Sequence, residues 1–169
     1  MSSATVWTVP TPDGPFSVLT DPDGTVLASG WTADADDVVA RVHPSARPTD
    51  VRRTPPPRAQ EAAEAVEAYY AGELDAILAV PVRQIGTPMR RQAWDALRTI
   101  PAGAPLTYTG LAAAIGAPAA VRPAAGACAS NAPALYVPCH RVLRSDGTLG
   151  GFAWGLDVKR SLLARESAA

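Results

Sequence analysis

The interpretation of this chain depends on the stretch Tyr136-Val-Pro-Cys-His-Arg-Val142, which places a cysteine, a histidine and an arginine side by side. Only the thiolate form of cysteine is a nucleophile, and an ordinary thiol with a pKa of about 8.5 is mostly protonated at neutral pH. A neighbouring imidazole or cation raises the thiolate fraction. Cys139 is therefore a candidate nucleophile.

The position of His140 relative to this thiol depends on the local backbone. We interpret Leu135–Val137 as a β-like run that leads to Cys139, and neighbours along an extended chain point to opposite sides. His140 then touches the thiol only if the backbone turns or a water molecule bridges the two side chains. A base also needs an orienting partner, and Glu166 in a C-terminal helix is a candidate carboxylate.

Two short helices are expected before this stretch. Thr107 is a suitable N-cap for a helix over Tyr108–Ile115, and Gly116 ends that helix. The second helix, over 119–129, has few bulky side chains, and we place Pro123 in its first turn because a proline farther inside would clash. The pair forms a helix-turn-helix pattern, whose smooth second helix suits either burial in the protein or a DNA groove.

The first third of the chain predicts a small sheet. Strands are expected near Val6–Val9, Phe16–Thr20 and Thr25–Ser29, and the turn Asp21-Pro-Asp-Gly24 joins the last two. Apolar periodicity and local start signals predict helices over Asp36–Val42, Arg58–Ala71 and Thr87–Leu97. The proline-rich stretch Val42–Pro57 is expected to be a loop.

The sequence therefore predicts an α+β protein with two domains. Residues 1–82 are expected to form an N-terminal domain with a small antiparallel sheet and helices. Residues 83–169 are expected to form a mostly helical C-terminal domain that contains the helix-turn-helix. The hydrophobic share of 47% is enough for a buried core, and 17 prolines favour many loops and short helices.

Charge is divided unevenly between the two halves. Residues 1–82 carry a net charge of −7 and residues 83–169 a net charge of +6. This asymmetry is typical of a protein with one face for a polyanion, although a solvated acidic N-terminal surface is an equally simple interpretation. Two cysteines make no disulfide framework and no Cys/His spacing fits zinc, so we expect neither a metal nor a cofactor.

The N-terminal residues carry neither the basic nor the apolar region of a signal peptide. The longest uncharged run, Thr99–Val121, contains three prolines and three glycines, which disfavours a membrane span. We therefore expect a cytoplasmic protein without membrane contact.

Pro138-Cys-His-Arg-Val142 resembles the active-site signature of the O6-alkylguanine–DNA alkyltransferases, also called methylated-DNA–protein-cysteine methyltransferases. The resemblance runs without gaps from about Met89 to Glu166 and keeps every spacing, whereas residues 1–82 match only in length and general character. The other similar stretches are Leu106-Thr-Tyr-Thr-Gly-Leu-Ala112, Val121-Arg122, Ala127-Cys-Ala-Ser-Asn131, Gly150-Gly-Phe-Ala-Trp-Gly-Leu156 and Lys159–Glu166.

The resemblance implies DNA repair by direct reversal. An alkyl group would move irreversibly from O6-alkylguanine to Cys139 in a single turnover, with O4-alkylthymine as a second candidate substrate. By the same resemblance, Glu166, His140 and a bridging water draw off the thiol proton. Asn131 would brace the turn around the cysteine, and Tyr108 would contact the extruded base and protonate it as the alkyl group leaves.

The implied partner is double-stranded DNA that carries O6-alkylguanine and is bound through its minor groove. A damaged base inside a duplex is unreachable, so the family flips it into a pocket, and Arg122 matches the residue that fills the gap. Further implied DNA contacts are Tyr108, Thr109, Ala125 and Ser145. The implied substrate-pocket residues are Val142, Phe152, Ala153 and Trp154. We expect a monomer in solution, with cooperative assembly on DNA as an open alternative.

Three residues depart from the family pattern. Pro123 shortens or bends the start of the recognition helix, Phe152 lacks the hydroxyl of a tyrosine, and Trp154 adds bulk at the pocket rim. We therefore expect large O6 substituents to react poorly, and comparable single-turnover rates for benzyl and methyl lesions would contradict this.

Two other functions fit parts of the sequence. An alkyltransferase-like protein binds alkylated bases without transfer, but such proteins lack the cysteine. A cysteine hydrolase would use Cys139 and His140 as nucleophile and base.

Overall fold

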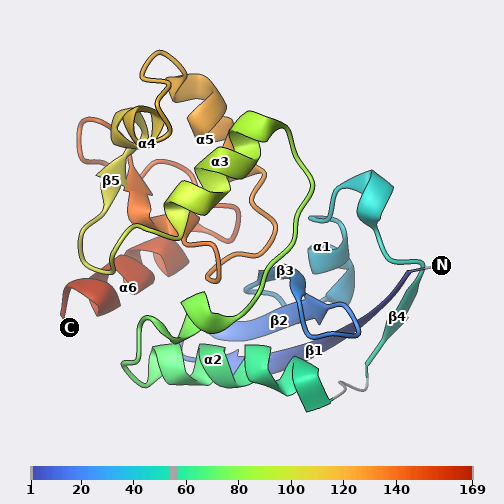
Figure 1. Cartoon of the computed structure of the whole chain (residues 1–169). Helices are drawn as coiled ribbons and strands as arrows, with labels where there is room; N and C mark the ends of the chain where they lie inside the picture. Colours follow the sequence, from blue (N-terminus) through green and yellow to red (C-terminus); the bar gives the residue numbers. More distant parts are fainter. Residues whose placement is uncertain (1, 54–56, 169) are drawn as a thin grey trace. The chain divides into compact units, whose positions relative to one another are not determined.

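A computed structural model describes residues 2–53 and 57–168 of the chain (Figure 1). It has the α+β architecture expected from the sequence. Across the residues described, no helix is both long and apolar enough to span a bilayer.

The backbone packs into two compact units. Unit 1 consists of Met1–Ile85 and Ala132–Tyr136, and unit 2 consists of Gly86–Asn131 and Val137–Ala169. The sequence suggested a continuous division between residues 82 and 83. The structure adds one excursion, because the segment that leads to Cys139 packs in the first unit.

Unit 1 contains a four-stranded sheet in the order β3-β2-β1-β4. Its strands are β1 (Ser3–Thr11), β2 (Gly14–Thr20), β3 (Val26–Gly30) and β4 (Asp50–Arg52). The three predicted strands are confirmed and pair antiparallel, with Val9 opposite Phe16.

The sheet has a fourth strand that the sequence did not predict, because β4 pairs parallel to β1 inside the stretch expected to be a loop, and the sheet is therefore mixed. The side chains of β4 are exposed and show no buried face that the sequence pattern could reveal. Its backbone nevertheless pairs with an edge of β1 that would otherwise leave polar groups without partners.

Two helices pack with this sheet: α1 (Ala35–Val39) and α2 (Gln60–Tyr70). The predicted apolar stripe of α2 is buried at Ala62, Val66 and Tyr69. This helix begins later than expected, because residues 57–59 form a 3-10 turn. Further 3-10 turns span Pro44–Ala46 and Ala76–Ala79.

The excursion Ala132–Tyr136 is held by buried hydrogen bonds within unit 1. The Ser29 amide donates to the carbonyl of Ala132 at 3.0 Å, and the Ser29 hydroxyl donates to the carbonyl of Ala134 at 2.8 Å. The hydroxyl of Tyr136 donates to the carbonyl of Ala62 at 2.6 Å. The predicted β-like run over Leu135–Val137 is wrong, because Leu135 has a left-handed φ of 74° and turns the chain.

Unit 2 is mostly helical, as expected. Its elements are α3 (Pro88–Leu97), β5 (Leu106–Thr107), α4 (Tyr108–Ala114), α5 (Val121–Ala129), η4 (Cys139–Arg141), β6 (Val142–Leu143) and α6 (Leu156–Ser167). Helix α5 packs against α3 and α4, and α6 packs against the 3-10 turn η4. The short strands β5 and β6 pair in parallel and join the start of α4 to the segment after Cys139.

The predicted helix-turn-helix is present as α4 and α5. The Thr107 side chain accepts a hydrogen bond from the Gly110 amide at 3.0 Å and caps α4 as predicted. Gly116 follows the helix with a left-handed φ of 73°, a conformation that glycine adopts without strain. Pro123 is the third residue of α5, where its missing N–H leaves no helical hydrogen bond unmade.

Candidate active site

Cys139 opens the 3-10 turn η4 and is 8% exposed. The Cys139 amide donates to the carbonyl of Val137 at 2.8 Å, and the Arg141 amide donates to the carbonyl of Pro138 at 3.0 Å. The chain is therefore not extended at the cysteine, and the sequence argument from an extended backbone does not apply. A thiol at this depth is reachable only by a group that enters a pocket in the protein surface.

Asn131 fastens the backbone immediately before the turn. Its side-chain Nδ2 donates to the carbonyl of Val137 at 2.8 Å, and the residue is 1% exposed. Val137 is the same residue whose carbonyl accepts the Cys139 amide. Asn131 at the end of the helix-turn-helix is thus joined through one carbonyl to the cysteine turn.

Behind the cysteine lies a buried network of charged groups. The His140 Nε2 and the Glu166 Oε2 are 2.7 Å apart, and Arg141 contacts both carboxylate oxygens, through Nε at 2.8 Å and Nη2 at 3.1 Å. The Arg141 Nη1 donates to the carbonyl of Ile100 at 2.8 Å. All three side chains of the network are at most 1% exposed, so the carboxylate is held by a bidentate arginine in a dry environment.

The protonation states of this network follow from its contacts. Burial raises the pKa of Glu166, but the hydrogen bonds from His140 and Arg141 and the nearby positive charge outweigh burial and lower this pKa to about 2. Burial, with the positive charges of Arg141 and Lys159, lowers the pKa of His140, although the contact with Glu166 opposes this. At neutral pH the carboxylate is therefore ionised and the imidazole neutral.

The neutral imidazole has a defined tautomer. An ionised carboxylate only accepts hydrogen bonds, so Nε2 of His140 carries the proton that it donates to Glu166. The other ring nitrogen, Nδ1, is then an acceptor, and it is buried without a hydrogen-bond partner among the described residues. A base with an oriented ring and a free lone pair therefore directly follows the candidate nucleophile.

Tyr108 is the first residue of α4 and lies close to the backbone of Gly150. A Cβ atom built on Gly150 would stand 3.1 Å from the Tyr108 hydroxyl, and Gly150 has a left-handed φ of 71°. Burial raises the pKa of Tyr108, negative charge on Cys128 and Cys139 adds to this, and Arg144 opposes it. The phenol is therefore a neutral hydrogen-bond donor at neutral pH, within electrostatic range of Cys139.

The predicted DNA-contacting residues fall into two groups. Thr109 and Ser145 are exposed and lie together, with their hydroxyl oxygens 2.9 Å apart. Arg122 is exposed in the first turn of α5, and Ala125 is half-buried one turn later. In the described part of the chain, the side chain of Arg122 forms no hydrogen bond or ion pair with another residue.

Of the predicted substrate-pocket residues, Val142 is the first residue of β6, and the other three lie near the end of the loop between β6 and α6. Val142 is fully buried, Ala153 is exposed, and Phe152 and Trp154 are half-buried. The indole Nε1 of Trp154 is buried and has no partner within residues 2–53 and 57–168. A ligand with an acceptor atom at this position would satisfy it.

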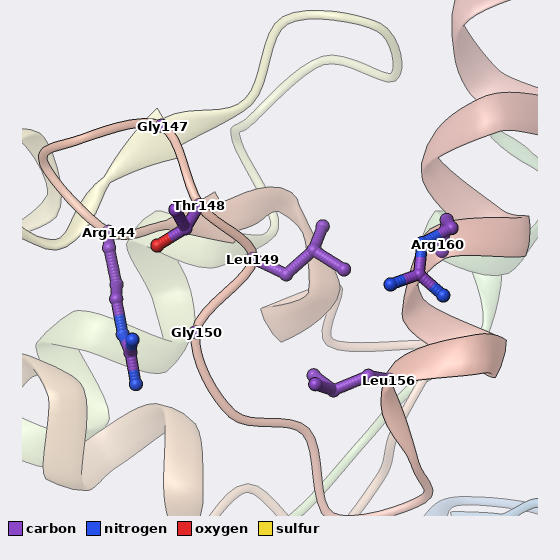
Figure 2. A pocket seen from close by; sticks show the side chains of 7 residues that line it. All are labelled: Arg144, Gly147, Thr148, Leu149, Gly150, Leu156 and Arg160. Atoms are coloured by element: carbon purple, nitrogen blue, oxygen red, sulfur yellow. The ribbon is translucent and has the colours of Figure 1, made fainter.

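A cavity of about 440 Å³ lies beside the same loop but has a different lining (Figure 2). Its lining residues are Arg144, Gly147, Thr148, Leu149, Gly150, Leu156 and Arg160. Figure 2 shows the guanidinium of Arg160 turned toward Leu149. None of the four predicted substrate-pocket residues lines this cavity.

Sequence reasoning missed two buried cations. Arg141 was quoted only as part of the signature, yet it makes the bidentate contact with Glu166. Lys159 is fully buried, and its Nζ donates to the carbonyls of Val142 at 2.8 Å and Gly151 at 3.3 Å. Arg141 and Lys159 are 8 to 25 residues away in sequence from these partners, so no local motif identifies the contacts. The one available signal was a charged residue at a position that faces the protein interior.

Within the described ranges, no cluster of three or more His, Cys, Asp or Glu side chains is placed to hold a metal ion.

The chain is similar to known DNA repair proteins over most of its length. Residues 88–168 match the family described as "6-O-methylguanine DNA methyltransferase, DNA binding domain". A methylated-DNA–protein-cysteine methyltransferase of Shigella flexneri is 34% identical over 158 residues, which are 94% of this chain and 92% of that protein. The crystal structure of Mycobacterium tuberculosis OGT in complex with DNA superposes with a TM-score of 0.81 at 30% identity, and covers 97% of this chain and 93% of that one.

The similarity to a longer relative covers about half of this chain. The bifunctional transcriptional activator/DNA repair enzyme Ada of Escherichia coli is 52% identical over 93 residues, which are 55% of this chain. The matched part is 26% of Ada, so about half of this chain is similar to about a quarter of that protein. The similarity to the Shigella protein extends over both units, and the chain belongs to the methylated-DNA–protein-cysteine methyltransferases, the family that repairs DNA by alkyl transfer to a cysteine.

Proposed function

We propose that this protein repairs DNA by moving the alkyl group of O6-alkylguanine onto Cys139, once and irreversibly. The observation that carries the proposal is the turn Cys139–Arg141. It places a buried thiol directly before an imidazole whose Nδ1 lacks a partner and whose Nε2 is held by an ionised carboxylate.

The arrangement accounts for the activation of the thiol. His140 Nδ1 takes the thiol proton, through a bridging water, and Glu166 stabilises the imidazolium that forms. Arg141 keeps the carboxylate oriented while the charge moves. Asn131 holds the backbone before Cys139 so that the sulfur keeps its direction.

The transfer is a single displacement. The sulfur attacks the alkyl carbon, an S–C bond forms, and the C–O6 bond breaks with its electron pair going to the guanine. The base gains a proton from Tyr108, whose raised pKa keeps the phenol protonated until that point. The product is a thioether, which water does not cleave, so each protein molecule acts once.

The DNA partner is a duplex that is bound through its minor groove by α5. Small side chains on this helix allow a close approach to the groove, and low sequence specificity there suits a search for damage. Arg122 fills the space of the flipped base, and Tyr108, Thr109, Ala125 and Ser145 contact the strand around it. The guanine edge meets main-chain groups of Cys139 and Val142, and Phe152, Ala153 and Trp154 line the pocket.

The two domains have separate roles in this proposal. Residues 83–169 bind DNA and carry out the transfer, and residues 1–82 are a scaffold. The protein works as a monomer in solution, with cooperative assembly on DNA as a further property to measure. Because its substrate is DNA, the protein acts in the cytoplasm in this proposal.

Mass spectrometry after mixing with O6-methylguanine duplex tests the proposal. We expect a permanent mass gain of one CH2, located on the peptide that contains Cys139, and no gain in Cys139→Ser. An unmodified complex with the lesion would instead support an alkyltransferase-like binder. Turnover of an ester substrate by the unmodified protein would support a hydrolase.

A further inference from the structure

The cavity at the start of α6 has no role in the proposed reaction. It encloses about 440 Å³ between the loop after β6 and the N-terminal part of α6 (Figure 2). Two arginines and two leucines are among its lining residues: Arg144, Arg160, Leu149 and Leu156. The lining, all of it within the described residues, includes none of the residues assigned to alkyl transfer or to the base pocket.

Arg144 is a cation without a protein partner at this cavity. Its side chain is exposed, and throughout the part of the chain that the structure describes it makes no hydrogen bond or ion pair. The carboxylate of Asp146, two residues later, instead accepts hydrogen bonds from the amide and hydroxyl of Thr148, at 3.0 and 2.7 Å. The guanidinium of Arg144 is therefore available for an anion.

Arg160 is a second cation that an anion can recruit. Its Nη1 lies 3.0 Å from Oδ1 of Asp157, but the two side chains are 63% and 102% exposed. An ion pair in this much water contributes little, so exchange of Asp157 for a ligand costs little. The N-terminal end of α6 adds partial positive charge at the same place, and Gly155 at its N-cap has no side chain to satisfy the first amides.

The size and the apolar part of the cavity favour an anion larger than inorganic phosphate. Small-molecule sites typically enclose about 300–1,000 Å³, so this cavity has room for a phosphate with an attached sugar. Arginine is well suited to phosphate, because its planar N–H groups bind two oxygens at once. In the view of Figure 2 the side chains of Leu149 and Leu156 lie between the two arginines, where they offer apolar surface to a deoxyribose.

The cavity also adjoins the surface that we assign to DNA. Ser145 directly follows Arg144, and its hydroxyl oxygen lies 2.9 Å from that of Thr109 on the exposed surface. Both hydroxyls are proposed contacts of the strand around the flipped base. A neighbouring sugar–phosphate unit of the same strand can therefore enter the cavity.

We propose that this cavity binds one sugar–phosphate unit of the lesion strand, with its two arginines holding the phosphate and its two leucines packing against the deoxyribose. The inference rests on the proposed function, because it adds a contact to the same DNA. Arg144 is the main anchor, since its guanidinium has no competing carboxylate. The contact fixes the position of the strand and carries no base specificity.

The salt dependence of DNA binding tests the two arginines. Affinity for O6-methylguanine duplex is measured in a Cys139→Ser background, in which binding is separated from transfer. Arg144→Gln should weaken binding about tenfold at low salt and reduce the slope of log affinity against log salt by about one. Arg160→Gln should act in the same direction but less, because Asp157 shares its guanidinium. Arg52→Gln removes an exposed, ion-paired arginine of unit 1 and should change neither quantity; an unchanged slope in Arg144→Gln would overturn the proposal.

Neutral linkages in the DNA identify the phosphate that is bound. A single methylphosphonate replaces each phosphate of the lesion strand in turn. At one linkage near the lesion it should weaken binding about tenfold in the Cys139→Ser protein, yet have little further effect when Arg144→Gln is also present, because the contact is already lost. Additive losses at every linkage would overturn the proposal.

Inorganic phosphate distinguishes a DNA phosphate from a free anion. The side-chain ¹⁵Nε–H signals of Arg144 and Arg160 are followed during addition of either lesion duplex or sodium phosphate at constant ionic strength. A shift with the duplex that disappears with the coupled methylphosphonate supports the proposal. A shift with phosphate and none with duplex would make the cavity a free-anion site and overturn it. These measurements need no alkyl transfer, so failed transfer by the parent would contradict the proposed function and leave them interpretable.

Discussion

The two units bury different kinds of polar groups. In unit 1 the buried polar residues are Thr5, Ser17, Thr20, Ser29 and Asp21, mostly hydroxyls that need one or two hydrogen bonds. In unit 2 they are Asn131, His140, Arg141, Lys159 and Glu166, four of them ionisable. Hydroxyls are inexpensive to bury, whereas a buried charge needs an ionic partner or, as at Lys159, carbonyl acceptors.

The buried ionisable groups of unit 2 lie at the candidate active site, where their burial costs stability. In unit 1, Asp21 and Arg83 form a partly buried ion pair at 2.9 Å, in which the Arg83 side chain is 61% exposed. The Arg141–Glu166 pair of unit 2 has a similar separation of 2.8 Å but is 1% exposed on both sides. The two ion pairs have almost the same length, but loss of a partner should cost much more free energy of unfolding in the buried pair than in the exposed one.

Matched removal of the two arginines is the strongest test of this contrast. Arg141→Met leaves the Glu166 carboxylate buried beside a neutral imidazole and should cost about 3–5 kcal/mol in the free energy of unfolding. Arg83→Met exposes Asp21 to water and should cost less than about 1 kcal/mol. Urea denaturation followed by circular dichroism measures both, and equal losses would show that burial does not separate the units.

The next largest expected effect is the loss of stability at acidic pH. The folded-state pKa of Glu166, about 2, lies below its ordinary 4.5, so folding favours the carboxylate. The resulting stability is complete above about pH 4.5 and is lost as the pH falls toward 2, in total about 3 kcal/mol. Unfolding free energies of the parent and of Glu166→Gln, measured from pH 6 to pH 2.5, should diverge at the acidic end. Glu61→Gln, an exposed control in α2, should follow the parent; if Glu166→Gln does too, the assignment fails.

Substitution of two glycines in the loop between β6 and α6 distinguishes the effect of backbone strain from the effect of contact with Tyr108. Gly147 and Gly150 both have left-handed φ values, 84° and 71°, so alanine at either position should cost roughly 1–3 kcal/mol of stability. Only at Gly150 does the new Cβ meet the Tyr108 hydroxyl. Gly150→Ala should therefore also slow single-turnover transfer by roughly tenfold or more, while Gly147→Ala should not. Equal rates for the two variants would remove Gly150 from the positioning of Tyr108.

The smallest effect is expected in unit 1. Tyr136→Phe removes the buried hydrogen bond to the Ala62 carbonyl and should cost about 1–2 kcal/mol. The transfer rate should stay the same, because the lost bond only anchors the backbone in unit 1. Thermal unfolding and single-turnover kinetics on the same sample measure both quantities, and a slower transfer would show that this anchor also sets the position of Cys139.

The sequence predicted structure correctly where a residue's conformation depends on residues close to it in the chain. Thr107 as a cap, Gly116 as a stop and Pro123 in a first turn are decided within four residues, and all three predictions are confirmed. Strand β4 was missed because its three residues are all exposed and its pairing is satisfied by the backbone alone.

The sequence predicted which residues form the candidate site better than it predicted how they are arranged. The spacing from Pro138 to Val142 and the position of Glu166 indicated the reacting groups. The sequence could not indicate that Leu135 takes a left-handed conformation, nor that a 3-10 turn follows, because both depend on contacts with distant residues. Lys159 was missed for the same reason, since a lysine in the first turn of a helix is normally solvated.

The five residues Ala132–Tyr136 have a consequence for how this protein can be divided. The chain leaves unit 2 after Asn131, crosses into unit 1, and returns at Val137, two residues before the sulfur. A fragment that starts at Gly86 would carry the fully buried Leu135 and Tyr136 as bare apolar surface in the middle of its sequence. The first 85 residues are therefore not an exchangeable accessory, since the backbone that leads to the nucleophile belongs in part to unit 1.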